Sequence, residues 1–185
     1  MRDMFICEIW SIVKLRHGNA VLLKPRGVAV AVPIFIGNME MQSILIAMEG
    51  LKLPRPMTHD LFLNVLNQVN LSIKRVEVFE LKDDTFHARL VITGGEYTNE
   101  KPFILDSRPS DAFAIAARKK CPIYIAAAVI EDAGIPLDFF TDPVEDEPDD
   151  KYKSLLEQLE QAVAEEEYEQ AAEIRDLIKK LQDDT

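Results

Sequence analysis

The sequence of 185 residues has only two cysteines and no apolar segment long enough to cross a membrane. A membrane-spanning helix needs about 20 mainly apolar residues, and no run of even about 18 occurs. The first residues also lack the long apolar core and the small-residue cleavage site of a secretory signal. Cys7 and Cys121 lie far apart in apolar contexts, which favours buried thiols over a disulfide. We therefore expect a cytoplasmic protein without membrane contact.

Several enzyme motifs are absent as well. The sequence contains no Walker loop, no dinucleotide-binding fingerprint, no zinc-type cysteine pair and no GxSxG elbow. Of the three histidines, His17 and His87 have no ligand-like neighbours, so only His59 is a candidate for chemistry. These absences exclude the enzyme classes that depend on those motifs.

Positive charge is scarce only near the C-terminal end. Residues 1–140 carry 16 Lys and Arg against 16 Asp and Glu, whereas residues 141–185 carry 5 against 16. The net charge of −11 therefore comes entirely from the tail. The balanced first part remains compatible with polyanion binding, whereas the acidic tail should repel nucleic acid and prefer a protein partner.

Composition divides the chain into three parts. Residues 1–140 are predicted to form the main domain. Residues 141–150 contain two prolines and six acidic residues, which is typical of a solvated linker. Residues 151–185 show apolar stripes at helical spacing, interrupted by Glu165–Glu167, and predict a small helical hairpin. Because such a hairpin buries little core by itself, we expect it to bind a partner.

The main domain is predicted to be α+β, with packed helices and a mixed, largely antiparallel sheet. Alternating apolar residues and turn signals predict strands at 4–14, 20–24, 28–36, 73–81, 85–93, 101–106 and 123–126. Helical spacing predicts helices at 39–51, 58–69, 109–119 and 127–133. The predicted N-caps are Asn38, Thr58, and Ser107 or Ser110. Pro109 suits a first helical turn.

Two polar clusters interrupt this apolar pattern. Residues 55–60 read Arg-Pro-Met-Thr-His-Asp, and residues 106–111 read Asp-Ser-Arg-Pro-Ser-Asp. Two helix N-termini that carry Arg, Thr or Ser can together bind a phosphate group. The carboxylates can hold a hard divalent cation, and His59 can transfer a proton or bind the metal. Such a site would suffice for phosphodiester hydrolysis.

The same residues also have a purely structural interpretation. Thr58 and Ser110 would cap helices, the aspartates would complement helix dipoles, and each arginine would be neutralised by a nearby aspartate. A lone histidine at a helix start is more often a hydrogen-bonded structural residue. The sequence does not show whether the two clusters meet in space.

Taken together, several motifs closely resemble the bifunctional nuclease domain family, over roughly residues 1–140. The matching segments are Pro33–Gly37, Glu40, Arg55–Leu61, Asp106–Ala116 and Pro122–Ile125. The resemblance implies an α+β domain, often oligomeric, that hydrolyses both DNA and RNA. Met41 and Phe113 stand where the family more often has Ala and an aliphatic residue, and both are interpreted as core substitutions.

The resemblance also implies a set of site residues, to which we assign roles as hypotheses. Asp60, Asp106 and Asp111 would hold Mg²⁺ or Mn²⁺, with Glu40 joining the catalytic carboxylates. His59 would be the acid or base. The residues that would bind the substrate phosphate are Arg55, Arg108 and Ser110.

The tail resembles a UVR motif, as found in bacterial excision-repair proteins and some Clp-protease partners. The matching segment is Tyr168–Ile178. The resemblance implies protein–protein contact, which agrees with the acidic charge of the tail. We expect it to link the main domain to a repair or regulatory protein.

Two functions of different classes follow from these observations. The first is a cytoplasmic nuclease, often homo-oligomeric in the family, whose tail binds a protein partner. The second is a non-catalytic binding or adaptor module, in which the motif residues form an anion pocket or a subunit interface. The balanced charge of residues 1–140 favours the second, because sequence-independent nucleic-acid binding usually uses a positive face.

Overall fold

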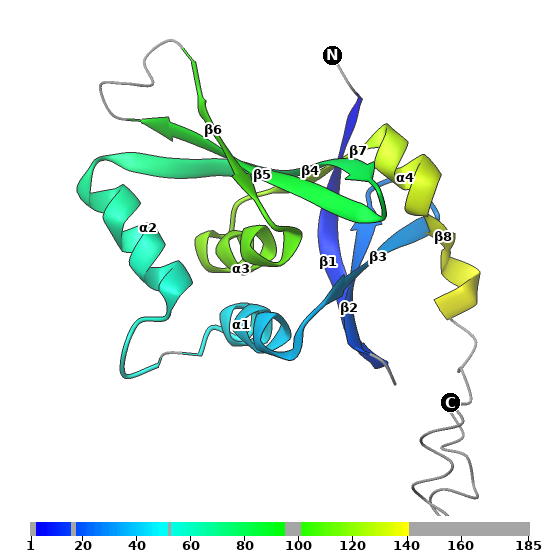
Figure 1. The fold of residues 1–185 in the computed structure, drawn as a ribbon, viewed down its shortest axis with the longest axis horizontal. Coiled ribbons are helices and arrows are strands. Elements are labelled where there is room, and N and C mark those ends of the chain that lie inside the picture. The colour runs from blue at the N-terminus through cyan, green and yellow to red at the C-terminus, as the bar shows by residue number, and fades with distance from the viewer. Residues whose placement is uncertain (1–2, 16–17, 52, 95–100, 141–185) are drawn as a thin grey trace, which may run out of the picture. The chain divides into compact units, whose positions relative to one another are not determined.

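Eight strands of the described part of the chain form one sheet in the order β6-β5-β4-β7-β1-β2-β3-β8 (Figure 1). The computed structural model describes residues 3–15, 18–51, 53–94 and 101–140. The strands are β1 (Met4–Leu15), β2 (Gly18–Pro25), β3 (Val30–Ile36), β4 (Leu71–Lys82), β5 (Thr85–Gly94), β6 (Phe103–Ser107), β7 (Ile123–Ala126) and β8 (Ile135–Pro136). The β4–β7 pair is parallel and the other pairs are antiparallel.

In the described ranges, four α-helices accompany the sheet. They are α1 (Asn38–Met48), α2 (Thr58–Gln68), α3 (Pro109–Lys119) and α4 (Ala127–Ala133), and the short 3₁₀ helix η2 (Leu137–Phe140) follows. Helix α3 packs against α1 and α2 and against strands β4 and β5 (Figure 1). The predicted α+β class, with its largely antiparallel sheet, is confirmed.

The core forms where α3 meets the sheet. Ala112, Phe113 and Ala116 are almost completely buried, because one face of α3 presents them to the inner side chains of β4 and β5. Of the two departures from the resembled family, Phe113 is a core residue, as predicted, whereas Met41 is only partly buried. The dense packing around α3 holds its N-terminal turn in place.

The β4–β5 hairpin shows how the local sequence determines a turn. Asp83 and Asp84 both adopt left-handed backbone conformations, with φ of 48° and 56°. Two residues of positive φ allow a tight turn whose twist matches that of the paired strands, and Asp tolerates this conformation better than most residues do. The predicted hairpin around these two residues is confirmed.

The predicted N-caps are wrong by one or more positions. Asn38 and Thr58 are the first residues of α1 and α2, and no cap side chain bonds the start of α1. Arg108 precedes α3, while the hydroxyl of Ser107 donates to the carbonyl of Arg108 and does not accept from the helix. Capping depends on exact backbone geometry, which residue preferences do not determine.

The structure also tests the predictions for the two cysteines, for the short elements and for membrane-spanning helices. Cys7 and Cys121 are free thiols, although Cys121 is only half-buried. Strand β8 and helix η2 were not predicted, because segments this short carry no clear periodicity. No helix of the described part has the length and apolar character needed to cross a membrane. The predicted linker at 141–150 and helical hairpin at 151–185 lie outside the described residues.

Candidate active site

The two polar clusters meet where the first turns of α2 and α3 lie close to α1. His59 in the first turn of α2 contacts Asp111 in the first turn of α3, although 52 positions separate them. The tight packing of α3 against α1 and α2 produces this approach. The side chains of Glu40, Ser43, His59, Arg108 and Asp111 form a continuous set of hydrogen bonds, which we call the polar network.

Arg108 and Asp111 form the most exposed pair of the polar network. The guanidinium donates twice to the carboxylate, from Nε to Oδ2 at 2.8 Å and from Nη2 to Oδ1 at 3.3 Å. Its Nη1 donates to Glu40 Oε1 at 3.3 Å. The Arg108 side chain is 66% exposed, so two carboxylates orient a cation that faces solvent. Such an oriented guanidinium suits a phosphate group.

His59 lies behind this pair. Its Nε2 is 3.1 Å from Asp111 Oδ1, and its Nδ1 is 3.1 Å from the hydroxyl of Ser43, which is almost completely buried. Because an ionised carboxylate only accepts hydrogen bonds, Nε2 carries the proton that it donates to Asp111. In the neutral ring, Nδ1 then accepts from Ser43. Both ring nitrogens are therefore engaged within the protein.

The surroundings of Asp111 keep it ionised. Partial burial alone would raise the pKa of its carboxyl group. Hydrogen bonds from Arg108 and His59, together with their charges, outweigh burial and lower the pKa of Asp111 below its usual value. The hydrogen bond and charge of Asp111 in turn raise the pKa of Arg108. The pair is charged throughout the physiological pH range.

Asp60 points away from the polar network, although it follows His59 directly. One of its oxygens accepts from the backbone N–H of Met57 at 2.9 Å, and the other accepts from Arg118 Nε at 2.9 Å. The first bond satisfies a free N–H group before α2, and the second ties α2 to the last turn of α3. This environment gives Asp60 a structural role.

Asp106 lies apart from the polar network. It stands opposite Arg89 in the β5–β6 ladder, while the preceding Leu105 packs against the core. Side chains alternate faces along a strand, so Asp106 lies on the sheet face away from the core. Among the described residues, no hydrogen bond or ion pair joins Asp106 to Asp60 or Asp111.

The predicted phosphate ligands other than Arg108 have separate positions. Ser110 is buried at the start of α3 and lines a cleft of about 330 Å³ together with Glu40 and Arg108. Arg55 is exposed in the segment before α2, where it lines a different cleft. The structure therefore brings Ser110 to the polar network and leaves Arg55 outside it.

The three predicted metal ligands do not share a site. Asp60 is paired with Arg118, Asp111 is paired with Arg108, and Asp106 lies on the other sheet face. Within the described ranges, no three His, Cys, Asp or Glu side chains are grouped so that they can hold one metal ion. The arrangement of these described residues does not fit the predicted Mg²⁺ or Mn²⁺ site.

Sequence reasoning missed two important residues. Ser43 lies three positions after Glu40 and therefore on the same face of α1, which is the signal that could have identified it. Arg118 lies two turns after Asp111 on α3, and its side chain bonds Asp60 and the backbone carbonyls of Ser43 and Ala114. Its position in the last turn of a predicted helix indicated only a favourable interaction of its positive charge with the helix dipole.

Comparison with known proteins identifies two regions. Residues 21–138 match the family model described as bifunctional nuclease domain. Residues 150–184 match the UvrB/uvrC motif. The first match contains every residue of the polar network, and the second begins in the acidic segment and covers the tail.

Individual relatives come from bacteria and plants. An uncharacterized protein of Mycobacterium tuberculosis is 33% identical over 130 residues, or 68% of this chain and 75% of the relative. Bifunctional nuclease 1 of Arabidopsis thaliana is 30% identical over 183 residues, or 88% of this chain and 55% of the relative. Bifunctional nuclease 1 of Oryza sativa subsp. japonica is 26% identical over 182 residues, or 88% of this chain and 54% of the relative. The chain thus spans about half the length of these plant relatives. The chain belongs to the bifunctional nuclease domain family.

Proposed function

We propose that this protein hydrolyses phosphodiester bonds in DNA and RNA, with Arg108 and Asp111 at the reacting phosphate. One observation carries the proposal: an exposed guanidinium is oriented by two carboxylates, and His59 lies directly behind one of them. Membership of the family and the names of its plant relatives support a nuclease.

Arg108 binds the phosphate in this proposal. A guanidinium has five N–H donors, and three of those of Arg108 are used by Asp111 and Glu40. The others remain available to phosphate oxygens. Charge that builds up on those oxygens in the transition state is then stabilised by a cation that is already oriented.

Asp111 accepts the proton of the attacking water. The water oxygen forms a bond to phosphorus, its proton passes to the carboxylate, and the bond from phosphorus to the leaving oxygen breaks. Solvent protonates that oxygen. The negative charge of a bound phosphate offsets the positive charge of Arg108, which weakens the interaction that lowers the pKa of Asp111 and makes the carboxylate a better base.

His59 acts through Asp111 and is a positioning residue. Its hydrogen bond holds one carboxylate oxygen, while Ser43 fixes the orientation of the ring from the other side. The hydrogen-bonded partner of a catalytic group commonly controls its orientation in this way. Asp60 and Asp106 have no part in this mechanism, and a requirement for Mg²⁺ or Mn²⁺ remains a prediction.

The test is cleavage of labelled single-stranded RNA and DNA by highly purified protein with Mg²⁺, Mn²⁺ or EDTA. Asp111→Asn keeps the shape of the side chain and removes its basicity, so we expect a loss of about 100-fold or more. Arg108→Lys should also lose activity, because an ammonium group lacks the planar fork. The matched control is Asp132→Asn on α4, which should cleave like the parent protein.

Two results would contradict the proposal. Unchanged cleavage by Asp111→Asn would place the activity elsewhere or in a contaminant. Equal losses in Asp106→Asn and Asp111→Asn would favour the carboxylate set derived from the sequence over the polar network.

One observation favours the second candidate function, a binding or adaptor module. Each carboxylate predicted to hold a metal is either paired with an arginine or lies outside the polar network. Arg108 would then form an anion pocket without catalysis. Oligonucleotide binding without cleavage in any metal condition would support this candidate.

The tail completes the proposed function. Its match to the UvrB/uvrC motif and its acidic charge support binding of a repair or regulatory protein by residues 151–185. Assembly into a homo-oligomer is a further part of the proposal, and light scattering on the purified protein measures it.

A further inference from the structure

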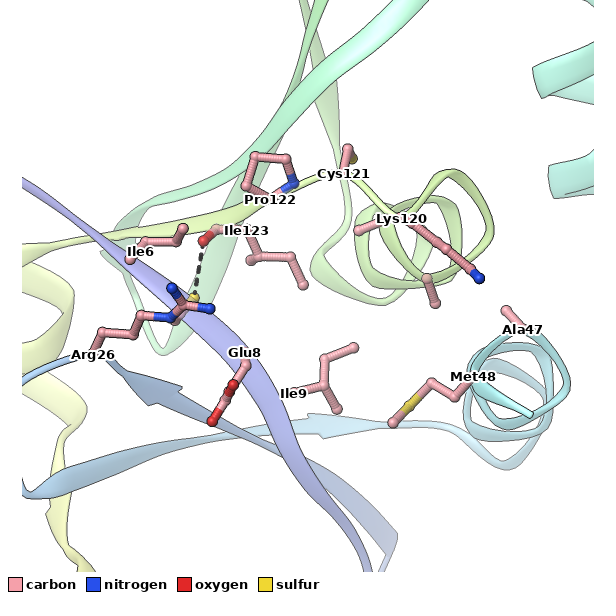
Figure 2. Close-up of a pocket in the computed structure, with 13 residues that line it drawn as sticks. Ile6, Glu8, Ile9, Arg26, Ala47, Met48, Lys120, Cys121, Pro122 and Ile123 are labelled. Atoms are coloured by element: carbon pink, nitrogen blue, oxygen red, sulfur yellow. Dashed lines mark hydrogen bonds between the residues drawn. The ribbon is translucent and has the colours of Figure 1, made fainter. Parts of the chain in front are cut away.

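Two clefts adjoin at the C-terminal ends of α1 and α3. One has a volume of about 530 Å³ and is drawn in Figure 2, and the other has a volume of about 700 Å³. Both are lined by Ala47, Ala117 and Lys120. Because they share these residues, we treat them as one surface groove and call it the basic groove.

The basic groove has an excess of positive charge. Its cationic side chains are Arg26, Arg55, Arg118, Lys119 and Lys120, and its carboxylates are Glu8 and Asp60. Asp60 is already neutralised by Arg118. Residues 1–140 carry equal numbers of positive and negative side chains, so the groove is more positively charged than the main domain as a whole.

Most of these cations are free to bind a ligand. Arg26, Arg55, Lys119 and Lys120 are exposed, and no ion pair joins their side chains to another described residue. The dipole of α3 accounts for basic residues in its last turn. It does not account for Arg26 and Arg55, which reach the groove from other segments of the chain.

The base of the groove is partly apolar. In Figure 2, Arg26 and Lys120 lie on opposite sides of the first cleft, with Ile123 between them and Ile9 and Met48 below. Cations beside apolar surface suit a ligand that alternates anionic groups with flat, weakly polar ones. A strand of nucleic acid has this pattern, with phosphates for the cations and bases for the apolar surface.

We propose that the basic groove binds a single strand of DNA or RNA through its phosphates, next to the bond that is cut. The link to cutting rests on the proposed function. The groove lies at the C-terminal end of α3 and the polar network at its N-terminal end. A helix of 11 residues is about 16 Å long. A strand of the roughly 4–16 nucleotides that such grooves accommodate can contact both ends.

The test measures binding without cleavage. Full-length protein is titrated into a fluorescein-labelled, single-stranded oligonucleotide with nuclease-resistant phosphorothioate linkages, and anisotropy is recorded at several salt concentrations. Replacing Lys119→Glu and Lys120→Glu together should raise Kd at least tenfold. The slope of log K against log salt should fall by about 1.4, because two phosphate contacts are lost at about 0.7 each.

Two further variants make the result specific. The double variant Lys74→Glu and Lys82→Glu changes the same charge at exposed positions of β4 outside the groove, and its Kd should stay within about twofold of the parent value. Arg55→Glu changes a loop residue and should weaken binding even if the Lys119 and Lys120 double variant folds poorly.

Three outcomes would overturn the proposal. An unchanged Kd in the groove variants would show that the groove does not bind the strand. Equal weakening in the β4 control would show that only total charge matters. Tighter binding by the groove variants would show that the strand binds elsewhere on the protein. Failure of the nuclease itself is distinguished in the parent protein, where binding that depends on the groove residues but is accompanied by no cleavage would contradict the proposed function and leave the groove proposal intact.

Discussion

Glu77 shows how a buried charge is tolerated outside the polar network. Its carboxylate lies in the middle of β4 with only 4% of the side chain exposed. Nε of Arg75 and Nε of Arg89 each donate to one of its oxygens at 2.6 Å. The two guanidinium groups lie over the rings of Tyr124 and Phe79. A buried charge persists when it is paired and hydrogen-bonded in this manner.

The titration of Glu77 couples folding to pH. Burial alone would raise its pKa, but the hydrogen bonds and charges of Arg75 and Arg89 outweigh burial and hold the pKa below the ordinary value of 4.5. The unfolded chain therefore takes up this proton at a higher pH than the folded protein does. The resulting stabilisation is present above about pH 4.5 and is lost as the pH falls through the folded-state pKa.

Glu77→Gln is expected to lower the free energy of unfolding by about 2 kcal/mol at neutral pH, because two charge-assisted hydrogen bonds are weakened. The variant should also lose less stability than the parent protein between pH 5 and pH 3, because it lacks the carboxylate that the parent protein must protonate. Urea denaturation across this pH range measures both effects. Glu131→Gln on α4 is the control, and a parent-like pH profile in Glu77→Gln would contradict the assignment.

At the scale of elements, Arg118 joins the three helices around the site. Its side chain is only 7% exposed. It donates to Asp60 near the start of α2, to the carbonyl of Ser43 in α1 and to the carbonyl of Ala114 in its own helix. The planar guanidinium can satisfy three acceptors in different directions. The relative placement of Ser43 and His59 thus depends on a residue outside the polar network.

Arg118→Met is expected to destabilise the fold by about 2 kcal/mol, since Asp60 loses its charged partner and two carbonyls lose a donor. Arg118→Lys should recover less than half of this loss, because an ammonium group cannot reproduce the fork geometry. Thermal unfolding followed by circular dichroism measures both variants. If Arg118→Met and the neighbouring exposed Lys119→Met melted alike, Arg118 would not have this role.

At the scale of the whole molecule, the described residues of the main domain pack around one core. Met1–Phe139 forms one compact unit, and its buried cluster extends from Cys7 to Val129. Near its end, the backbone N–H of Leu137 donates to the carbonyl of Ala29 and holds η2 against the rest of the domain. The main domain thus contains the polar network, the basic groove and the core.

A chain that ends after Phe140 is expected to fold by itself. Because Met1–Phe139 forms one compact unit, its melting temperature should lie within about 3 °C of that of the full chain, a difference below 1 kcal/mol for a domain of this size. It should also retain the cleavage activity of the full chain. Calorimetry and the oligonucleotide assay measure the two properties. A much lower melting temperature or aggregation would show that residues 141–185 contribute to folding.

The sequence by itself determined those features of the fold that depend on residues close together in the chain. Periodicity located the described α-helices and most of the described strands, Asp83-Asp84 located a hairpin, and the placement of Pro109 in the first turn of α3 was correct. The motifs also identified the family, which the match of residues 21–138 confirms. These features are local because backbone preference and side-chain spacing act within a few residues.

Only the tertiary structure decided which charged groups meet. Arg108 and Asp111 are three residues apart and pair as expected, whereas the contact of His59 with Asp111 depends on how α2 packs against α3. Asp60 pairs with Arg118, and the alternation of β6 places Asp106 on the other sheet face. The strength of an ion pair depends on distance in space, and close packing sets that distance between residues far apart in the chain.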